Sequence, residues 1–360
     1  MTTATKLEFD EARMEAFMGT LMGNLSGTLV TYACAVGDRL GLFRDLATSG
    51  PADPDELAAR TGISWRYACE WMGCLACAGY LDFDTETRRF SLPAEHVPAL
   101  ATPGHPAYVG AFFEAPFVME QMGLLGKLTE AFRTGKGVPQ EAYGPDYQRV
   151  IEGLSAGWFD ALLVPEWLPQ APGVVEKLTA GAEVADIGCG AGRAIIRMAE
   201  AFPASRFTGF DVYEPAVSMA NSKAAAAGVT DRVRFEQRDA ATGLPGRYDL
   251  ITAVDVLHDL ARPMDVLRSV RAALKPGGTF LVLEMNATDT PEGNIGPLGA
   301  MLYGISILYC LSTSLAQDGA ALGTAGLPEA RLREHCLAAG LRSVTRRLET
   351  PMNVLYEVKA

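Results

Sequence analysis

Three alternating glycines that closely follow an acid in the sequence form the part of the chain best suited to bind a ligand. Asp186 follows the apolar pair Val184 and Ala185, and residues 193–202 have the pattern of a helix. The glycines between them are Gly188, Gly190 and Gly192. This order predicts a strand, a tight turn and a helix N-terminus, which is where an α/β sheet accepts an adenosine-containing ligand.

The spacing of this turn argues against two common nucleotide loops. A dinucleotide site would have a third glycine where Arg193 stands, and the Gly-Lys-Ser/Thr of a Walker loop does not follow. The nearby Asp186 would repel a pyrophosphate but suits a ligand that carries an ammonium and a sulfonium. S-adenosylmethionine is such a ligand, although a glycine-rich turn can also be no more than a tight turn.

The next three predicted strands each lead into an acid. The strands and their acids are 206–211 with Asp211, 232–237 with Asp239, and 248–254 with Asp255. A carboxylate after the second strand can accept hydrogen bonds from ribose hydroxyls, and one after the third can accept the adenine amino group. One such acid could be a helix cap, but four at successive strand ends are hard to explain that way. The predicted cofactor-binding residues are Asp186, Gly188, Gly190, Gly192, Asp211, Val212, Asp239, Ala240, Val254 and Asp255.

With these motifs and the turn Leu274-Lys-Pro-Gly-Gly278, residues 175–360 resemble a class I S-adenosylmethionine-dependent methyltransferase. One departure is Asp211, because the family more often has Glu at that position. The resemblance implies an α/β fold with a Rossmann-like, seven-stranded sheet whose last strand runs antiparallel. Residues 341–349 and 352–358 fit the final two strands.

His258 is the candidate catalytic residue. It follows the fourth strand in Asp255-Val-Leu-His-Asp259, which matches the His-Asp pair of plant-like and bacterial O-methyltransferases. In those enzymes the histidine is the general base, which is needed when the acceptor must lose a proton. An orienting hydrogen bond and a structural role remain open for His258. Glu284, after the fifth strand, is expected to orient His258, to bind an acceptor group or to act as a cap.

Residues 42–92 have the pattern of a winged helix-turn-helix. A DNA-reading helix presents Arg, Lys, Asn or Gln to bases and phosphates, but residues 64–79 offer only Arg66, which Glu70 opposes. The arrangement resembles the dimerisation module of small-molecule O-methyltransferases, so we favour a homodimer over a transcriptional regulator. The predicted elements are helices within 42–48, 51–62 and 64–79 and strands at 80–84 and 89–92.

The chain is expected to have three parts. Residues 1–104 form a helical winged-helix dimerisation domain, 105–174 a helical linker with acceptor-side helices, and 175–360 the catalytic domain. A lid insertion over 287–326 is uncharged across most of its length, which points to a small, largely apolar acceptor, although it can equally pack against a partner subunit. Its apolar residues at helical spacing are Leu298, Met301, Leu302, Ile305 and Leu308, with Tyr303 and Tyr309 as polar handles.

Charge and hydropathy exclude several classes of partner. The net charge of −12 argues against sequence-independent binding to nucleic acid or to an anionic membrane. Two uncharged stretches, 16–37 and 293–317, contain glycines and polar residues, so we predict buried helices rather than membrane spans. The run 16–36 together with the charge-poor winged unit should nevertheless leave more apolar surface than a monomer tolerates.

The seven cysteines and the N-terminus predict a cytoplasmic protein without a metal site. The cysteines are scattered among apolar residues, as in a reducing compartment, and no signal peptide is evident. Cys74 and Cys77 have the CxxC spacing, but no second pair or histidine pair accompanies them. We therefore predict that they are buried core residues and not zinc ligands.

The sequence thus favours S-adenosylmethionine-dependent methyl transfer to a small, largely apolar organic molecule, with oxygen as the preferred acceptor atom. Nitrogen, sulfur or carbon acceptors that need only alignment remain open. So do a cofactor-binding protein that transfers no methyl group and a winged-helix regulator.

Overall fold

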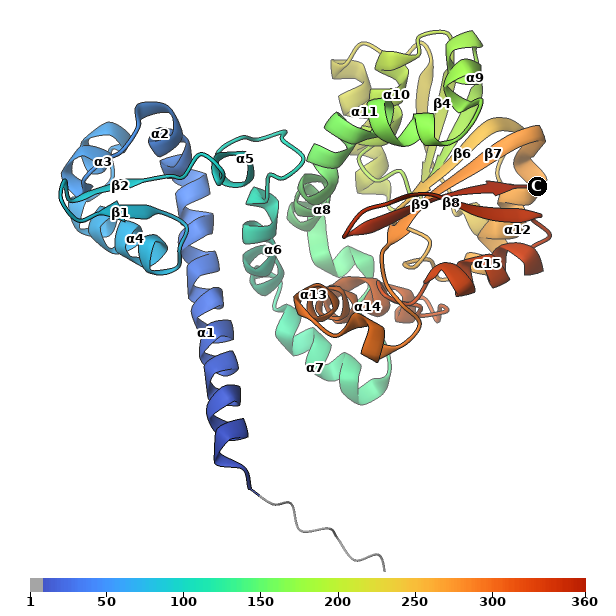
Figure 1. Ribbon diagram of the computed structural model, residues 1–360. Coiled ribbons are helices and arrows are strands. Elements are labelled where there is room, and N and C mark those ends of the chain that lie inside the picture. The colour runs from blue at the N-terminus through green and yellow to red at the C-terminus, as the bar shows by residue number, and fades with distance from the viewer. Residues whose placement is uncertain (1–8) are drawn as a thin grey trace, which may run out of the picture. The chain divides into compact units, whose positions relative to one another are not determined.

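A computed structural model describes residues 9–360, and the chain divides into two compact units that meet in sequence at Glu114 and Ala115 (Figure 1). The first unit contains the predicted three helices and two antiparallel strands of a winged helix-turn-helix. Its core is built around Phe43, Leu57 and Met72, which are buried. Its elements are α1 (Glu11–Leu40), α2 (Leu42–Ser49), α3 (Pro54–Thr61), α4 (Trp65–Cys77), β1 (Asp82–Asp84), β2 (Arg89–Ser91) and α5 (Val97–Leu100).

The long helix α1 corrects the prediction of a buried helix over 16–37. It begins at a cap in which the Asp10 carboxylate accepts from the Arg13 N–H, and it ends at Gly41, whose φ is 71°. From its start to Leu29 every residue is exposed, because the small core reaches only the C-terminal part of the helix. The buried residues of α1 are Val30, Cys34, Ala35 and Gly37.

The cysteine prediction is also wrong in part. Cys74 is half-buried and Cys77 is exposed, so this pair lies at the surface side of α4 and not in the core. The core of this unit is instead filled by larger apolar residues of α4, Trp71, Met72 and Leu75.

The second unit contains a seven-stranded sheet in the order β5-β4-β3-β6-β7-β9-β8 (Figure 1). The predicted class is confirmed: β9 alone runs antiparallel to both of its neighbours, and the other pairs in this sheet are parallel. The strands are β3 (Glu183–Ile187), β4 (Arg206–Asp211), β5 (Val233–Gln237), β6 (Tyr248–Val254), β7 (Leu274–Met285), β8 (Ser343–Glu349) and β9 (Asn353–Lys359).

Helices cover both faces of this sheet, because buried strand residues alternate between two apolar clusters. Val184 packs with the first group of helices, and its neighbour Ala185 faces the second. The first group is α9 (Val174–Ala180), α10 (Arg193–Ala201) and α11 (Glu214–Ala226), and the second is α12 (Pro263–Ala273) and α15 (Glu329–Ala338).

A further apolar cluster joins the linker helices to the lid insertion. Leu128, Tyr147 and Tyr309 belong to it, so the lid packs on α7 and α8 of its own chain. The helical elements involved are α6 (Gly110–Gln121), α7 (Leu124–Thr134), α8 (Gly144–Trp158), a π-helical segment η2 (Phe159–Trp167), α13 (Pro297–Ile305), the π-helical η6 (Ser306–Cys310) and α14 (Leu311–Leu315).

One continuous helical stretch, Pro297–Leu315, is long and apolar enough to cross a bilayer by length and composition alone. This differs from the expectation that neither uncharged stretch would meet that criterion. Of its most apolar window, 44% is buried within the protein. One such helix is weak support for a membrane span.

Candidate active site

Two of the three glycines in the turn have atoms of neighbouring side chains at their Cβ positions, and the third has open space there. A Cβ on Gly188 would lie 2.3 Å from Cγ2 of Val256, and one on Gly192 would lie 2.4 Å from the Phe235 ring. Gly190 also has a positive φ, of 51°, but nothing lies within 4 Å of its Cβ position. The outer two glycines are therefore needed for packing, and the middle one leaves room for a ligand above the turn.

Asp211 lies at the end of β4 and holds the turn in place. Its two carboxylate oxygens accept from the backbone N–H groups of Gly190 and Tyr213, each at 2.9 Å. Burial raises the pKa of Asp211 despite these bonds. Both oxygens keep a further lone pair, so the predicted bonds to ribose hydroxyls are compatible with the local geometry.

Asp186 is buried in the centre of the sheet. Its Oδ1 accepts from the Thr252 hydroxyl at 2.5 Å, and burial raises its pKa to about 7. A buried acid with one hydrogen bond is poised to pair with a cationic group, which would lower that pKa again.

Asp239 follows β5 and acts as the helix cap that the sequence left as an alternative. Its Oδ1 accepts from the Ala241 N–H at 2.8 Å, and its Oδ2 pairs with Arg262. Next to Asp211, Val212 is 46% exposed and offers an apolar surface at the same edge of the sheet. The predicted contact of Asp239 with an adenine amino group stays a prediction.

Asp255 begins the loop after β6 in a strained backbone conformation, with φ of 56°. Left-handed φ at a residue other than glycine is uncommon and clusters at functional sites. Burial raises the pKa of Asp255 to about 7, and its Oδ1 has no hydrogen-bond partner among the described residues. Asp255, at the end of β6, therefore lies beside His258, and its unpaired Oδ1 is 3.9 Å from His258 Nδ1.

His258 and Glu284 form a buried pair at the carboxyl edge of β6 and β7. Glu284 Oε2 lies 2.6 Å from His258 Nδ1, and its other oxygen accepts from the His258 backbone N–H at 3.3 Å. Of the three roles open to Glu284, the geometry fits orientation of His258. The imidazole ring is 2% exposed and the Glu284 carboxylate 1%.

Two neighbours of His258 that the sequence reasoning did not assign lie beside its other ring nitrogen. Asp259 Oδ1 is 3.1 Å from Nε2, and the thiol of Cys310, from the lid, lies next to both. Burial alone lowers the pKa of His258, but the charges of Glu284 and Asp259 outweigh it and raise that pKa well above its ordinary value. Burial raises the pKa of Cys310 to about 12, so the thiol stays neutral.

Three tyrosine rings from the linker and the lid pack against one another in tilted and edge-to-face contacts near this group. The centroids of Tyr143, Tyr147 and Tyr309 lie 5.0–5.1 Å apart. Tyr309 is on η6, and its hydroxyl is within electrostatic reach of both Asp259 and Asp211. The sequence marked only Tyr309 of these three, as a polar handle of the lid, and the fold shows that it meets the other two.

Arg193 has a role that the sequence could not show. Its guanidinium pairs with Glu152 at 3.0 Å and with Asp160 at 2.8 Å, on α8 and η2. The residue that replaces the third glycine of a dinucleotide loop therefore ties the linker helices to the start of α10.

Two groups of potential metal ligands occur among the described residues, and both share His258. One adds Asp259 and Cys310, the other Asp255 and Glu284, with donor atoms within 4.8 Å of one another in each. The sequence predicted no metal site, and an oxygen nucleophile activated by a base needs none. The absence of a metal stays a prediction.

Comparison with known proteins agrees with this fold. Residues 178–303 match the family described as "Methyltransferase domain", and residues 28–102 match "Rv2258c-like winged HTH domain". The 3-hydroxy-5-methyl-1-naphthoate 3-O-methyltransferase of Streptomyces sahachiroi is 29% identical over 299 residues, which is 80% of this chain and 83% of that protein.

Two solved structures share this fold over nearly all of the chain. Mitomycin 7-O-methyltransferase superposes with a TM-score of 0.66 at 20% identity, over 98% of this chain and 100% of that one. Human N-acetylserotonin methyltransferase in complex with S-adenosylmethionine gives a TM-score of 0.68 at 19% identity, over 99% and 100%. The chain therefore belongs to the S-adenosylmethionine-dependent methyltransferases and joins an N-terminal winged-helix domain to their catalytic domain.

Proposed function

We propose that this chain methylates a hydroxyl oxygen of a small, largely apolar organic molecule, with His258 as the general base. The observation that carries the proposal is the buried His258–Glu284 pair, in which Nδ1 and Oε2 are 2.6 Å apart. A carboxylate at Nδ1 keeps the proton on that nitrogen, so Nε2 can take a proton once the acceptor hydroxyl replaces Asp259, whose Oδ1 lies 3.1 Å from Nε2. The relative from Streptomyces sahachiroi is named for transfer to an oxygen, which supports the same assignment.

The residues at the carboxyl edge of the sheet fit S-adenosylmethionine. The open space above Gly190 would admit the ligand, Asp211 would accept from its ribose hydroxyls, and buried Asp186 would suit its positive charge. Val212, Ala240 and Val254 would supply apolar contacts. When bound, the cofactor supplies an electrophilic methyl group on its sulfonium.

The protein's own residues then have separate tasks. His258 accepts the hydroxyl proton at Nε2 as the oxygen becomes nucleophilic, and Glu284 stabilises the resulting imidazolium. The linker helices and the lid exclude water and align the acceptor, because alignment supplies a large share of the rate in a displacement reaction.

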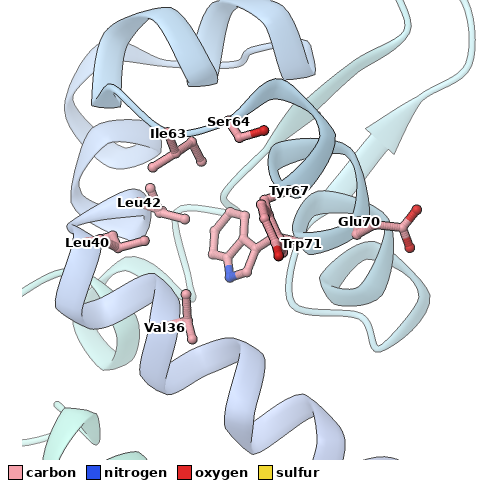
Figure 2. Close-up of a pocket in the computed structure, with 8 residues that line it drawn as sticks. All are labelled: Val36, Leu40, Leu42, Ile63, Ser64, Tyr67, Glu70 and Trp71. Atoms are coloured by element: carbon pink, nitrogen blue, oxygen red, sulfur yellow. The ribbon is translucent and has the colours of Figure 1, made fainter.

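We also infer that the chain forms a cytoplasmic homodimer through its first unit. The exposed apolar side chains of α1 include Phe17, Leu21 and Leu25. They continue to Val36 and Leu40, which line an apolar cavity of about 330 Å³ with Tyr67 and Trp71 of α4 (Figure 2). We assign this continuous surface to a second copy of α1, since the two copies would present matching uncharged faces. Helix α4, which would be the DNA-reading helix, favours a dimer contact over DNA binding, because its Arg66 is paired with Glu70.

The experiment that tests the function is transfer from methyl-labelled S-adenosylmethionine to an extract of small molecules from the producing cells. We expect a labelled product of low mass whose fragmentation places the methyl group on oxygen. A labelled amine, thiol or carbon centre would contradict the oxygen assignment, and the absence of any labelled product would contradict methyl transfer.

A further inference from the structure

Three side chains of the kinds that bind soft divalent cations converge at one nitrogen of the His258 ring. His258 and Asp259 come from the loop after β6, and Cys310 comes from η6 in the lid. Each offers one ligand atom, and these atoms lie within 4.8 Å of one another. The side chain of His258 is 2% exposed and Cys310 is 4% exposed, but the side chain of Asp259 is 25% exposed. An ion can therefore approach the cluster from the side of Asp259.

Distances distinguish this cluster from the second group that shares His258. Two ligands of a tetrahedral zinc ion, each at about 2.0–2.3 Å from the metal, lie about 3.3–3.8 Å from one another. Asp259 Oδ1 lies 3.1 Å from His258 Nε2, close to that spacing. Glu284 Oε2 lies 2.6 Å from Nδ1, which is the length of a hydrogen bond and too short for two ligands of one ion. The cluster at Nε2 is therefore the better metal site.

Glu284 prepares His258 for such a role from the far side of the ring. A carboxylate at one nitrogen of a metal-binding histidine fixes the tautomer, orients the ring and raises the basicity of the other nitrogen. Glu284 makes this contact at Nδ1. With the proton held there, Nε2 and the Asp259 carboxylate face one another as two acceptors. A cation between them, either a proton or a metal ion, removes that repulsion.

The chemistry of the three donors selects the metal. An imidazole nitrogen, a carboxylate oxygen and a thiolate sulfur suit zinc, whereas magnesium and calcium prefer oxygen ligands alone. The Cys310 thiol gives up its proton to solvent as its sulfur binds the metal, and no oxidation is involved. The sequence prediction of no metal site was argued from Cys74 and Cys77. It could not include a site that forms only when η6 packs against the loop after β6.

We propose that His258, Asp259 and Cys310 bind a zinc ion, and that this ion inhibits methyl transfer. The ion occupies Nε2, the atom that must accept the hydroxyl proton, so zinc and the acceptor compete for the same position. The binding of zinc does not depend on the function proposed above, but its inhibitory effect rests on that function. The ion is not a cofactor, because base-catalysed transfer to oxygen needs no metal.

The test adds Co²⁺ to full-length protein that has been treated with a chelator. Cobalt replaces zinc in such sites, and a cobalt–thiolate bond produces a charge-transfer band in the near ultraviolet. We expect this band at one cobalt per chain, and Zn²⁺ should abolish it by displacement. Cys310→Ala should give no band. Asp259→Asn should keep the band but bind cobalt at least about tenfold more weakly, since even the loss of an outer-shell partner costs about 10–100-fold in affinity.

Two variants serve as matched controls. Cys77→Ala removes an exposed cysteine of the first unit and should leave the band and the affinity unchanged. Asp255→Asn alters the other group of potential ligands and should also keep the band. Should Cys310→Ala fail to fold, Cys310→Ser, which keeps a polar atom at the same place, must lose the thiolate band instead.

The inhibitory effect is measured on methyl transfer at saturating S-adenosylmethionine. Zn²⁺ should stop the reaction of the unmodified protein, and Cys310→Ala should require at least about tenfold more Zn²⁺ for the same inhibition. The proposal is overturned if the unmodified protein gives no cobalt band, if the band survives Cys310→Ala, or if saturating Zn²⁺ leaves the rate unchanged or raises it. A protein that transfers no methyl group at all refutes the proposed function, while the cobalt spectra still decide whether the metal site exists.

Discussion

The acids around His258 decide when it can act as a base. Glu284 and Asp259 raise the pKa of His258, so the imidazole stays protonated to higher pH than an ordinary histidine. Since only the neutral ring accepts a proton, activity should fall as pH decreases, with a midpoint above about 6.5. In Glu284→Gln the amide keeps a hydrogen-bonding atom but loses the charge, and the midpoint should move down. A pH–rate profile measures both, and a midpoint unchanged by Glu284→Gln would argue against this coupling.

Asp186 should couple cofactor binding to pH. Its pKa of about 7 means that it is partly protonated near neutrality before a cation arrives. Because the charged carboxylate binds the cationic ligand, affinity for S-adenosylmethionine should fall as pH decreases below 7, by at most about tenfold per unit. In Asp186→Asn the affinity should be lower and nearly independent of pH. Calorimetry from pH 6 to 8 checks this, and a flat profile in the unmodified protein would contradict it.

At the residue scale, the sequence was informative wherever a side chain followed a strand. His258, Glu284 and the four acids could be predicted because parallel strands end at one edge of the sheet. Cys310 could not, because it lies within an apolar helical segment where nothing marks its partner. Its proximity to the site depends on how η6 packs.

At the scale of elements, the glycine turn separates a packing role from a binding role. Gly192→Ala places a Cβ 2.4 Å from Phe235 at a φ of 79°, so we expect a loss of stability of roughly 1–3 kcal/mol. Gly190→Ala meets no atom within 4 Å; it should cost about 1–2 kcal/mol for the left-handed φ and weaken cofactor binding at least tenfold. Urea unfolding and calorimetry separate the two, and equal effects of both variants on affinity and stability would refute the distinction.

The elements themselves followed from local patterns, but their burial did not. Capping residues, glycines and apolar periodicity predicted the winged unit and the strands of the sheet. The same apolar composition placed α1 in a core, yet its N-terminal part is exposed, because a helix of 30 residues exceeds the reach of the core beside it. Hydropathy indicates that the apolar face of a helix will be covered, but it does not indicate whether the core of the same chain or a second chain covers it.

At the scale of the whole molecule, the exposed face of α1 predicts a dimer. Light scattering at micromolar concentration should report a mass near twice 38.4 kDa. A double substitution, Leu21→Glu with Leu25→Glu, should yield monomers, because it buries two charges in the proposed contact. Leu125→Glu is the control, since Leu125 is an exposed apolar residue outside α1 and should leave the mass unchanged. A monomeric unmodified protein would disprove the assignment.

Removal of the acceptor proton by His258 is the central step of the proposed reaction. The direct measurement is single-turnover methyl transfer to the identified acceptor by His258→Gln and His258→Ala, with cofactor affinity determined in parallel. If His258 is the base, both variants should transfer the methyl group more slowly by a factor of about 10² to 10⁴, the range for positioned proton transfer. Their affinity for the cofactor should be nearly unchanged. If Gln retains most of the rate, His258 only orients the acceptor. If both variants retain it, the acceptor needs no deprotonation, and base-catalysed O-methylation is contradicted.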